Sequence, residues 1–210
     1  AVTEEGVAVV TARYEMPQVK GVLTMTYRIN GAGEVSVAEQ LEAGDAEAPG
    51  MFRFGMTMAM PARYSEIVYY GRGAHENYCD RLSSADLGLY SQKVADQYHD
   101  EYVRPQESGT KSDLRWWSVV DSSGSGLVIL SEAPFSASAL PYATEALDVT
   151  NFPPQQHSGP LRSGDRTYVN FDLRQMGLGC INSWGELPED QYMIPYGDYT
   201  FRFLLRPTVK

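Results

Sequence analysis

The chain has 210 residues, of which 43% are apolar and 21% charged, a composition typical of a globular protein with a substantial core. Its formal net charge is −10, and no run of Lys and Arg offsets it, which argues against nucleic acid as a partner. No apolar stretch approaches the roughly 20 residues of a membrane-spanning helix, and no signal peptide is recognisable, so the compartment, cytoplasm or periplasm, stays open.

Alternating apolar and polar residues predict β-strands in the first third of the chain. Residues 23–29 (LTMTYRI) alternate strictly and run into the turn NGAG, from which residues 34–41 (EVSVAEQL) return, so a hairpin is expected. Residues 52–60 (FRFGMTMAM) repeat the alternation, with Phe52 and Phe54 on the apolar side. Each of these strands should bury one face.

The same pattern continues further along the chain. Residues 114–121 (LRWWSVVD) and 126–131 (GLVILS) flank a Gly/Ser-rich turn and predict a second hairpin, and residues 199–205 (YTFRFLL) predict a last strand. Trp116 and Trp117 are adjacent, so on a strand they face opposite sides. One of them should lie in the core, which leaves the other for a second layer, a partner surface or a ligand.

Helical signal is scarce. Residues 143–150 (ATEALDVT) predict two helical turns with Thr144 as a candidate N-cap, and residues 83–90 (SSADLGLY) predict the start of another helix. Many short strands with so few helices favour an all-β fold. We expect one large antiparallel two-sheet β-sandwich that forms a single domain over residues 1–210.

The segment GRGAHENYCDR, residues 71–81, carries many side chains that enzymes use. One interpretation makes His75 a general acid or base beside a neighbouring carboxylate. The other interpretation is structural: Asn77 and Asp80 accept from backbone N–H groups freed where the strand ends, and Arg81 forks onto a carboxylate. A single histidine without a positioned partner is a weak signal, so the residues favour the structural interpretation.

A second segment, QMGLGCINSWGE at residues 175–186, places a tryptophan in a polar, glycine-rich turn. The indole of Trp184 can present a flat apolar face to a sugar ring, and Asn182 and Ser183 can reach the ring hydroxyls. The alternative is that Trp184 turns inward and fills the end of the sandwich. Composition leaves both alternatives open.

The remaining chemistry-bearing residues predict no catalytic or metal site. Cys79 and Cys180 lack cysteine or histidine neighbours at metal-ligand spacing, and we expect two free thiols. Arg104 and Glu107 flank a proline turn, which is more typical of a stabilising ion pair than of a catalytic dyad. No nucleophile elbow, phosphate loop or dinucleotide fingerprint occurs in the sequence.

Taken together, the segments resemble a known family. YYGRGAHENYCDR is similar to the G-x-G-P-x-E-N-Y-P-D-R motif of the C-terminal, small-chain domain of glycoside hydrolase family 2 β-galactosidases. Five further segments resemble motifs of that domain in the same order, over roughly residues 20 to 207: YVRPQESG, LRWWSVVD, FSASALPY, MGLGCINSWG and GDYTFRFLLRP.

The resemblance implies a large two-sheet supersandwich related to galactose mutarotases, and a parent enzyme that hydrolyses terminal β-galactosides with retention. The nucleophile and acid/base glutamates of such enzymes lie in a separate TIM barrel, so no catalytic residue is expected in this chain and the isolated chain should be inactive. By its motif position, Trp184 would contact the substrate, with Ser183 and Asn182 beside it. No metal ligand or cofactor is expected here, since the Mg and Na ions of parent enzymes belong to other parts.

The motif loop maps onto five residues that should shape the sandwich and its interface with the barrel: Glu76, Asn77, Tyr78, Asp80 and Arg81. Departures from the family pattern are also clear. Ala74 and Cys79 replace two prolines, and Cys180-Ile181-Asn182 stands where many relatives carry Gly-Asp-Asp, so two negative charges beside the tryptophan are lost.

An upstream segment typical of the domain is not recognisable either. This suggests an N-terminally truncated fragment of a larger multidomain chain, or a split chain, whose parent enzyme is homo-oligomeric. Two alternatives remain: a stand-alone mutarotase-like sugar isomerase, which would use His75, and a lectin-like carbohydrate-binding module, which would use Trp184 as its platform.

Overall fold

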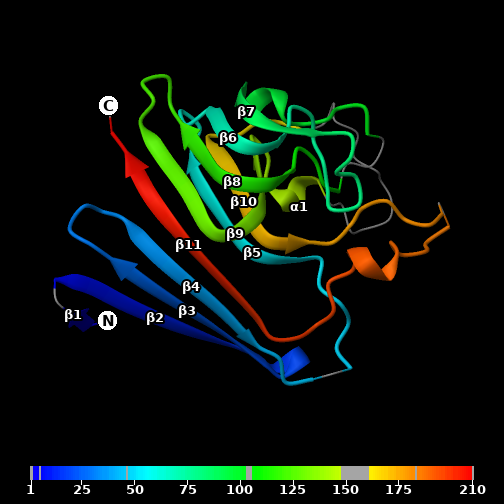
Figure 1. Cartoon of the computed structure of the whole chain (residues 1–210), viewed down its shortest axis with the longest axis horizontal. Helices are drawn as coiled ribbons and strands as arrows, with labels where there is room; N and C mark the ends of the chain where they lie inside the picture. The colour runs from blue at the N-terminus through cyan, green and yellow to red at the C-terminus, as the bar shows by residue number, and fades with distance from the viewer. Residues whose placement is uncertain are drawn as a thin grey trace.

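The computed structural model describes residues 2–4, 6–45, 47–102, 106–147, 161–182 and 184–209, and most of them lie in antiparallel β-strands (Figure 1). The strands are β1 Val2–Glu4, β2 Val7–Met16, β3 Gly21–Ile29, β4 Val35–Glu42, β5 Arg53–Pro61, β6 Glu66–Gly73, β7 Asp86–Lys93, β8 Lys111–Val120, β9 Gly126–Leu140, β10 Arg166–Gln175 and β11 Tyr199–Thr208. The helices are α1 Thr144–Leu147 and three 3₁₀ turns at Pro17–Val19, Val94–Asp96 and Asp190–Tyr192. No helix in these ranges is long and apolar enough to cross a membrane.

One continuous sheet makes both layers of the fold. Its main path runs β1-β2-β3-β4-β11-β9-β8-β6-β7, and β10 and β5 branch from it through β9. Residues 126–131 of β9 pair with β11, whereas residues 136–140 pair with β10, so the sheet folds over along this one long strand. The predicted all-β antiparallel sandwich is confirmed, with the refinement that its two layers are parts of one sheet.

Aromatic residues from the two layers meet in a common core. Phe171 of β10 lies edge-on to Phe203 of β11 with ring centroids 5.0 Å apart, and Phe54 of β5 lies 5.4 Å from Tyr199 of β11. Full burial of a side chain of this size contributes roughly 1.5–3 kcal/mol. The alternation read from residues 52–60 and 199–205 therefore supplies facing apolar surfaces for the two layers.

Both predicted hairpins are present. Ile29 pairs with Val35 at the end of the β3–β4 hairpin, and Val120 pairs with Gly126 at the end of the β8–β9 hairpin. Trp117 is fully buried and stacks on Tyr69 at 5.0 Å, whereas Trp116 is partly exposed. The prediction that only one of the two tryptophans enters the core is confirmed.

Three local predictions differ from the structure. Residues 83–90 do not begin a helix, because most of them belong to β7, which pairs with β6 over its full length. Phe52 lies just before β5 and is 75% exposed, so the apolar face begins only at Phe54. The helix predicted at residues 143–150 is a single turn that starts at Thr144 itself, and residues 148–150 lie outside the described part.

Candidate functional site

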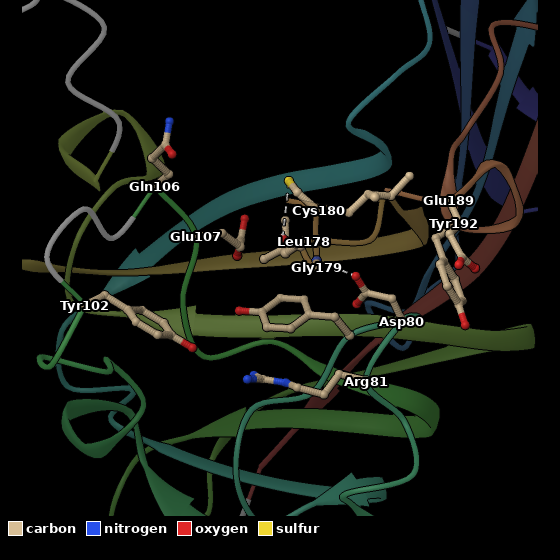
Figure 2. A pocket seen from close by; sticks show the side chains of 12 residues that line it. Asp80, Arg81, Tyr102, Gln106, Glu107, Leu178, Gly179, Cys180, Glu189 and Tyr192 are labelled. Atoms are coloured by element: carbon tan, nitrogen blue, oxygen red, sulfur yellow. Dashed lines mark hydrogen bonds between the residues drawn. The ribbon is translucent and has the colours of Figure 1, made fainter. Parts of the chain in front are cut away.

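A cleft of about 790 Å³ lies where the loop after β6 meets the segment after β10. Figure 2 shows Asp80 and Arg81 on one side, Leu178, Gly179 and Cys180 on another, and Tyr102, Glu107 and Tyr192 around the remaining rim. The lining residues are Tyr78, Asp80, Arg81, Tyr102, Gln106, Glu107, Leu178, Gly179, Cys180, Ile181, Glu189 and Tyr192. The two segments that the sequence singled out thus lie side by side, although they are about 100 residues apart.

Glu76 is buried, lines a second cavity rather than this cleft, and gathers several donors. Its carboxylate accepts from the Gly109 N–H at 2.8 Å, from the Arg81 guanidinium at 2.8 Å, from the Tyr78 hydroxyl at 3.2 Å and from the Tyr102 hydroxyl. Burial alone would raise the pKa of Glu76, but the hydrogen bonds outweigh it and hold the pKa below its usual value. Glu76 therefore stays ionised and ties three segments of the chain together.

Asn77 stabilises the same loop through hydrogen bonds in the interior. The side chain is fully buried, donates to the carbonyls of Arg72 and His75 at 3.1 Å, and accepts from the Ser112 N–H at 3.0 Å. Its backbone N–H donates to the Thr110 carbonyl at 2.8 Å. These are the contacts that the structural interpretation of the loop requires, and that role stays a prediction.

His75 is exposed and lies outside the first cleft. Its Nε2 is 3.2 Å from the Ser84 hydroxyl, a partner that is not a carboxylate. It lines the second cavity, of about 590 Å³, together with Lys111, a fully buried amine that donates to Gln97 and to the Gly109 carbonyl. Burial lowers the pKa of Lys111 to about 8.

Asp80 joins the two loops directly. Its Oδ2 accepts a hydrogen bond from the Gly179 N–H at 2.5 Å, which Figure 2 draws between the two loops. Gly177 comes so close that a Cβ there would stand 2.6 Å from Asp80 Oδ2 and 2.9 Å from the Cβ of Tyr192. Gly177 thus allows the two loops to approach each other closely, because a side chain at this position would collide with both neighbours.

Trp184 projects into solvent. It is 91% exposed, and its backbone N–H donates to Oδ1 of Asn182 at 2.8 Å, whereas Ser183 lies outside the described residues. Trp184 does not line the cleft itself, although Gly179, Cys180 and Ile181 of the same turn do. The alternative that Trp184 fills the end of the sandwich is therefore wrong.

Exposed apolar side chains accompany Trp184 along the turn. Leu178, Ile181 and Leu187 are 42%, 65% and 57% exposed. Several large apolar side chains exposed on one short segment are typical of a surface that meets a ligand or another protein surface. We refer to residues 177–187 as the Trp184 turn.

A charged cluster, which the sequence did not predict, extends inward from the cleft residue Glu107. Glu107 pairs with Arg53 at 2.8 Å, and Arg53 Nε lies 3.7 Å from the carboxylate of Asp172. Arg104, the expected partner of Glu107, lies outside the described residues. Burial raises the pKa of Asp172 to about 7 despite Arg53, and burial also raises the pKa of Glu107. An acidic residue inside the apolar run YVNFDL was the one signal in the sequence for this cluster.

The cysteines and acidic residues form no metal centre within the described ranges. Cys79 and Cys180 are both free and exposed, which confirms the expected thiols. No group of three or more His, Cys, Asp or Glu side chains among the described residues could hold a metal ion.

Comparison with known proteins relates this geometry to a family. A family model described as "Beta galactosidase small chain" matches residues 1–205. A β-galactosidase of Priestia megaterium is 32% identical over 185 residues, which are 87% of this chain and 17% of the relative. A β-galactosidase of Lactobacillus delbrueckii subsp. bulgaricus is 32% identical over 92% of this chain and 18% of the relative. The chain thus spans less than a fifth of the length of these relatives.

Among solved structures, an aldose 1-epimerase candidate of Escherichia coli K12 aligns over 100% of this chain and 68% of its own, with 8% identity and a TM-score of 0.49. An aldose epimerase homologue of C. elegans aligns over 99% of this chain and 67% of its own, with 8% identity and a TM-score of 0.40. With the match over residues 1–205 and the relatives at about one-third identity, the chain belongs to the β-galactosidase small-chain family.

Proposed function

We propose that this chain is the C-terminal sandwich domain of a retaining β-galactosidase of glycoside hydrolase family 2, which hydrolyses terminal β-galactosides. In this proposal, Trp184, with Asn182 and Ser183, contacts the galactoside, and the surrounding Trp184 turn meets a TIM-barrel domain. The catalytic glutamates belong to that barrel, and the parent enzyme is homo-oligomeric. Any Mg or Na ions that the parent enzyme uses belong to parts outside this chain.

The observation that carries the proposal is the exposure of Trp184 on a turn that rims the cleft, in a chain that belongs to the small-chain family. An indole that is 91% exposed offers both faces to a partner, and the C–H face of a pyranose is apolar enough to stack on it. The matched segment is 17–18% of the length of these relatives, which leaves room in them for a separate catalytic domain.

The first test is whether the chain alone hydrolyses 4-nitrophenyl β-galactoside. We expect no turnover above the uncatalysed rate, because the three carboxylates of the cleft are already engaged: Asp80 by the Gly179 amide, Glu107 by Arg53 and Glu189 by the Gln191 amide. Efficient turnover by the pure chain would contradict the proposal that the catalytic glutamates belong to a separate barrel.

The second test is Trp184→Ala in the complete enzyme of which we propose this chain to be a part. Loss of a stacking contact of about 1–1.5 kcal/mol should raise KM for the galactoside about tenfold, with a smaller change in kcat. Tyr14→Ala is a matched control, because Tyr14 is an exposed aromatic residue on the distant strand β2. An unchanged KM in the Trp184 variant would refute the sugar contact.

Calorimetry on the chain alone separates the proposal from a lectin-like module. We expect no binding of galactose or lactose at millimolar concentration, since the indole would meet sugar only beside the barrel. Millimolar or tighter binding that is lost in Trp184→Ala would favour an independent binding module instead.

A further inference from the structure

We propose that Asp80 is a positioning residue for Trp184. By accepting the Gly179 N–H, its carboxylate fixes the start of the Trp184 turn against the loop after β6 and so sets where the indole stands relative to the cleft. This inference rests on the proposed function only for its consequence on substrate binding. The structural part, that Asp80 orders the turn, stands on contacts alone.

The loop that carries Asp80 is held in place by buried hydrogen bonds. Four residues upstream of Asp80, Glu76 is buried and accepts from the Gly109 and Arg81 donors at 2.8 Å, and the buried Asn77 bonds across to Ser112 of β8. The Arg81 N–H donates back to the Tyr78 carbonyl at 2.8 Å, which closes a turn around Asp80. The carboxylate of Asp80 therefore projects from a loop whose backbone is fixed by the interior.

The Trp184 turn, by contrast, has few hydrogen bonds to the rest of the chain. Gly177 donates to the Tyr192 carbonyl at 2.9 Å, and Gly179 donates to Asp80 at 2.5 Å. Beyond Gly179, the hydrogen bonds of the described part of the turn stay within it. The Ile181 N–H donates to the Leu187 carbonyl at 3.5 Å, the Trp184 backbone N–H donates to the Asn182 side chain, and the Cys180 thiol donates to the Leu178 carbonyl at 3.8 Å. Among the described residues, the bond to Asp80 is thus the last one to another segment before the tryptophan.

The chemistry of this bond suits a positioning role. A carboxylate that accepts a backbone N–H makes a short, charge-assisted hydrogen bond with a defined direction. Both partners are accessible to water, which limits what the bond adds to global stability. Loss of Asp80 should therefore change the place of the turn more than the stability of the fold, and this separates positioning from a merely structural role.

Gly177 makes the attachment possible. Because a Cβ at this position would stand 2.6 Å from Asp80 Oδ2, an alanine there would push the turn away from Asp80. Gly177→Ala and Asp80→Ala should displace the same turn, so their effects on Trp184 should be less than additive in the double variant.

The direct experiment is ¹H–¹⁵N NMR of the 210-residue chain. In Asp80→Ala we expect the Gly179 amide to move upfield and to exchange with solvent about fivefold faster or more, and the Trp184 indole N–H to shift or broaden. Asp80→Asn keeps an acceptor oxygen without the charge and should be intermediate. Unchanged Gly179 and Trp184 signals in Asp80→Ala would overturn the inference.

Asp198→Ala is a matched control. Asp198 also accepts a long-range backbone N–H, from Ala43 at 2.8 Å, at an exposed place, so its loss should lower stability by a similar amount. It should leave the Trp184 signals in place. If Asp198→Ala moves them as much as Asp80→Ala does, the effect is a general loosening and the inference fails.

Kinetics of the complete enzyme separate this inference from the proposed function. We expect Asp80→Ala to raise KM about fivefold with little change in the melting temperature. If Trp184→Ala raises KM but Asp80→Ala does not, the positioning role fails and the proposed function stands. If Asp80→Ala shifts the Trp184 signals while Trp184→Ala leaves KM unchanged, the positioning role stands and the sugar contact fails.

Discussion

Replacing Asn77 by Ala should lower the free energy of unfolding by about 3–5 kcal/mol, a very large effect for one polar side chain. The side chain is fully buried, and its three hydrogen bonds satisfy the carbonyls of Arg72 and His75 and the N–H of Ser112. Alanine would leave these groups unpaired, at about 1–3 kcal/mol for each group that water cannot reach. Denaturant unfolding followed by tryptophan fluorescence measures the change.

Asn30→Ala provides the matched control. Asn30 makes three side-chain hydrogen bonds as well, to the amides of Ala32 and Glu34 and to the Glu34 carboxylate, but it lies in the exposed β3–β4 turn. Water can replace those partners, so the loss should be only about 0.5–1.5 kcal/mol. If Asn77→Ala lowers the free energy of unfolding no more than Asn30→Ala does, Asn77 does not stabilise the loop after β6 as its contacts indicate.

The strands could be predicted from the sequence because apolar and polar residues alternate along a strand that buries one face. The pair at residues 23–29 and 34–41 shows this well: each strand alternates, the NGAG turn lies between them, and the register closes with Ile29 opposite Val35. The adjacent tryptophans on β8 follow the same rule, which is why one of them had to be buried. The resemblance added the order of the motifs and the fold type.

The strand β7 could not be predicted, because its partner decides its structure. Residues 83–90 carry a helix-like start, but Asp86–Lys93 forms eight pairs with β6, and this ladder outweighs local preference. β7 is also the edge of the sheet, which leaves Leu87 and Leu89 46% and 69% exposed. Its inner face is only partly buried, through Tyr90, and the two leucines lie on the outer face, so the sequence lacks the apolar alternation that identifies the other strands.

The candidate site could be predicted in its two segments but not in its contacts. The close approach of Gly177 to Asp80, and the sharing of Arg53 by Glu107 and Asp172, join residues between 54 and 119 positions apart. Sequence spacing says nothing about such pairs, because they depend on how the sheet folds over along β9. The sequence therefore suggested the near neighbour Arg104 as the ion-pair partner of Glu107, whereas the structure pairs Glu107 with Arg53 of β5.

The second large effect should be a loss of stability as the pH rises, caused by two buried acids. Burial raises the pKa of Glu39 to about 7, helped by the negative charge of Asp172, and burial raises the pKa of Asp172 to about 7, with Arg53 opposing and Glu107 adding to the shift. One carboxylate oxygen of Glu39 has no hydrogen-bond partner within the described residues. In the unfolded chain both groups should titrate near pH 4.

The sign follows from proton binding. Between about pH 4 and pH 7 the folded state holds protons on Glu39 and Asp172 that the unfolded state has lost, so stability falls as the pH rises. The contribution is fully present below the unfolded pKa values and is gone above about pH 7. For Glu39 alone, the rise of the pKa from 4.5 to about 7 contributes about 3 kcal/mol to this loss. The unfolding free energy should therefore be clearly higher at pH 5 than at pH 8.

Glu39→Gln isolates half of this effect. The amide keeps the shape but cannot ionise, so the variant should be no more stable than the wild type at pH 5, and more stable at pH 8. The quantity to measure is the difference between variant and wild type at the two pH values, about 2–3 kcal/mol, because any packing cost of the amide cancels in it. Glu42→Gln, on the exposed end of the same strand, should show no such difference. If Glu39→Gln behaves like Glu42→Gln, Glu39 is ionised in the folded protein at both pH values, and the prediction is wrong. Glu39 lies between Met25 of β3 and Phe201 of β11, so its charge would then have to be stabilised there.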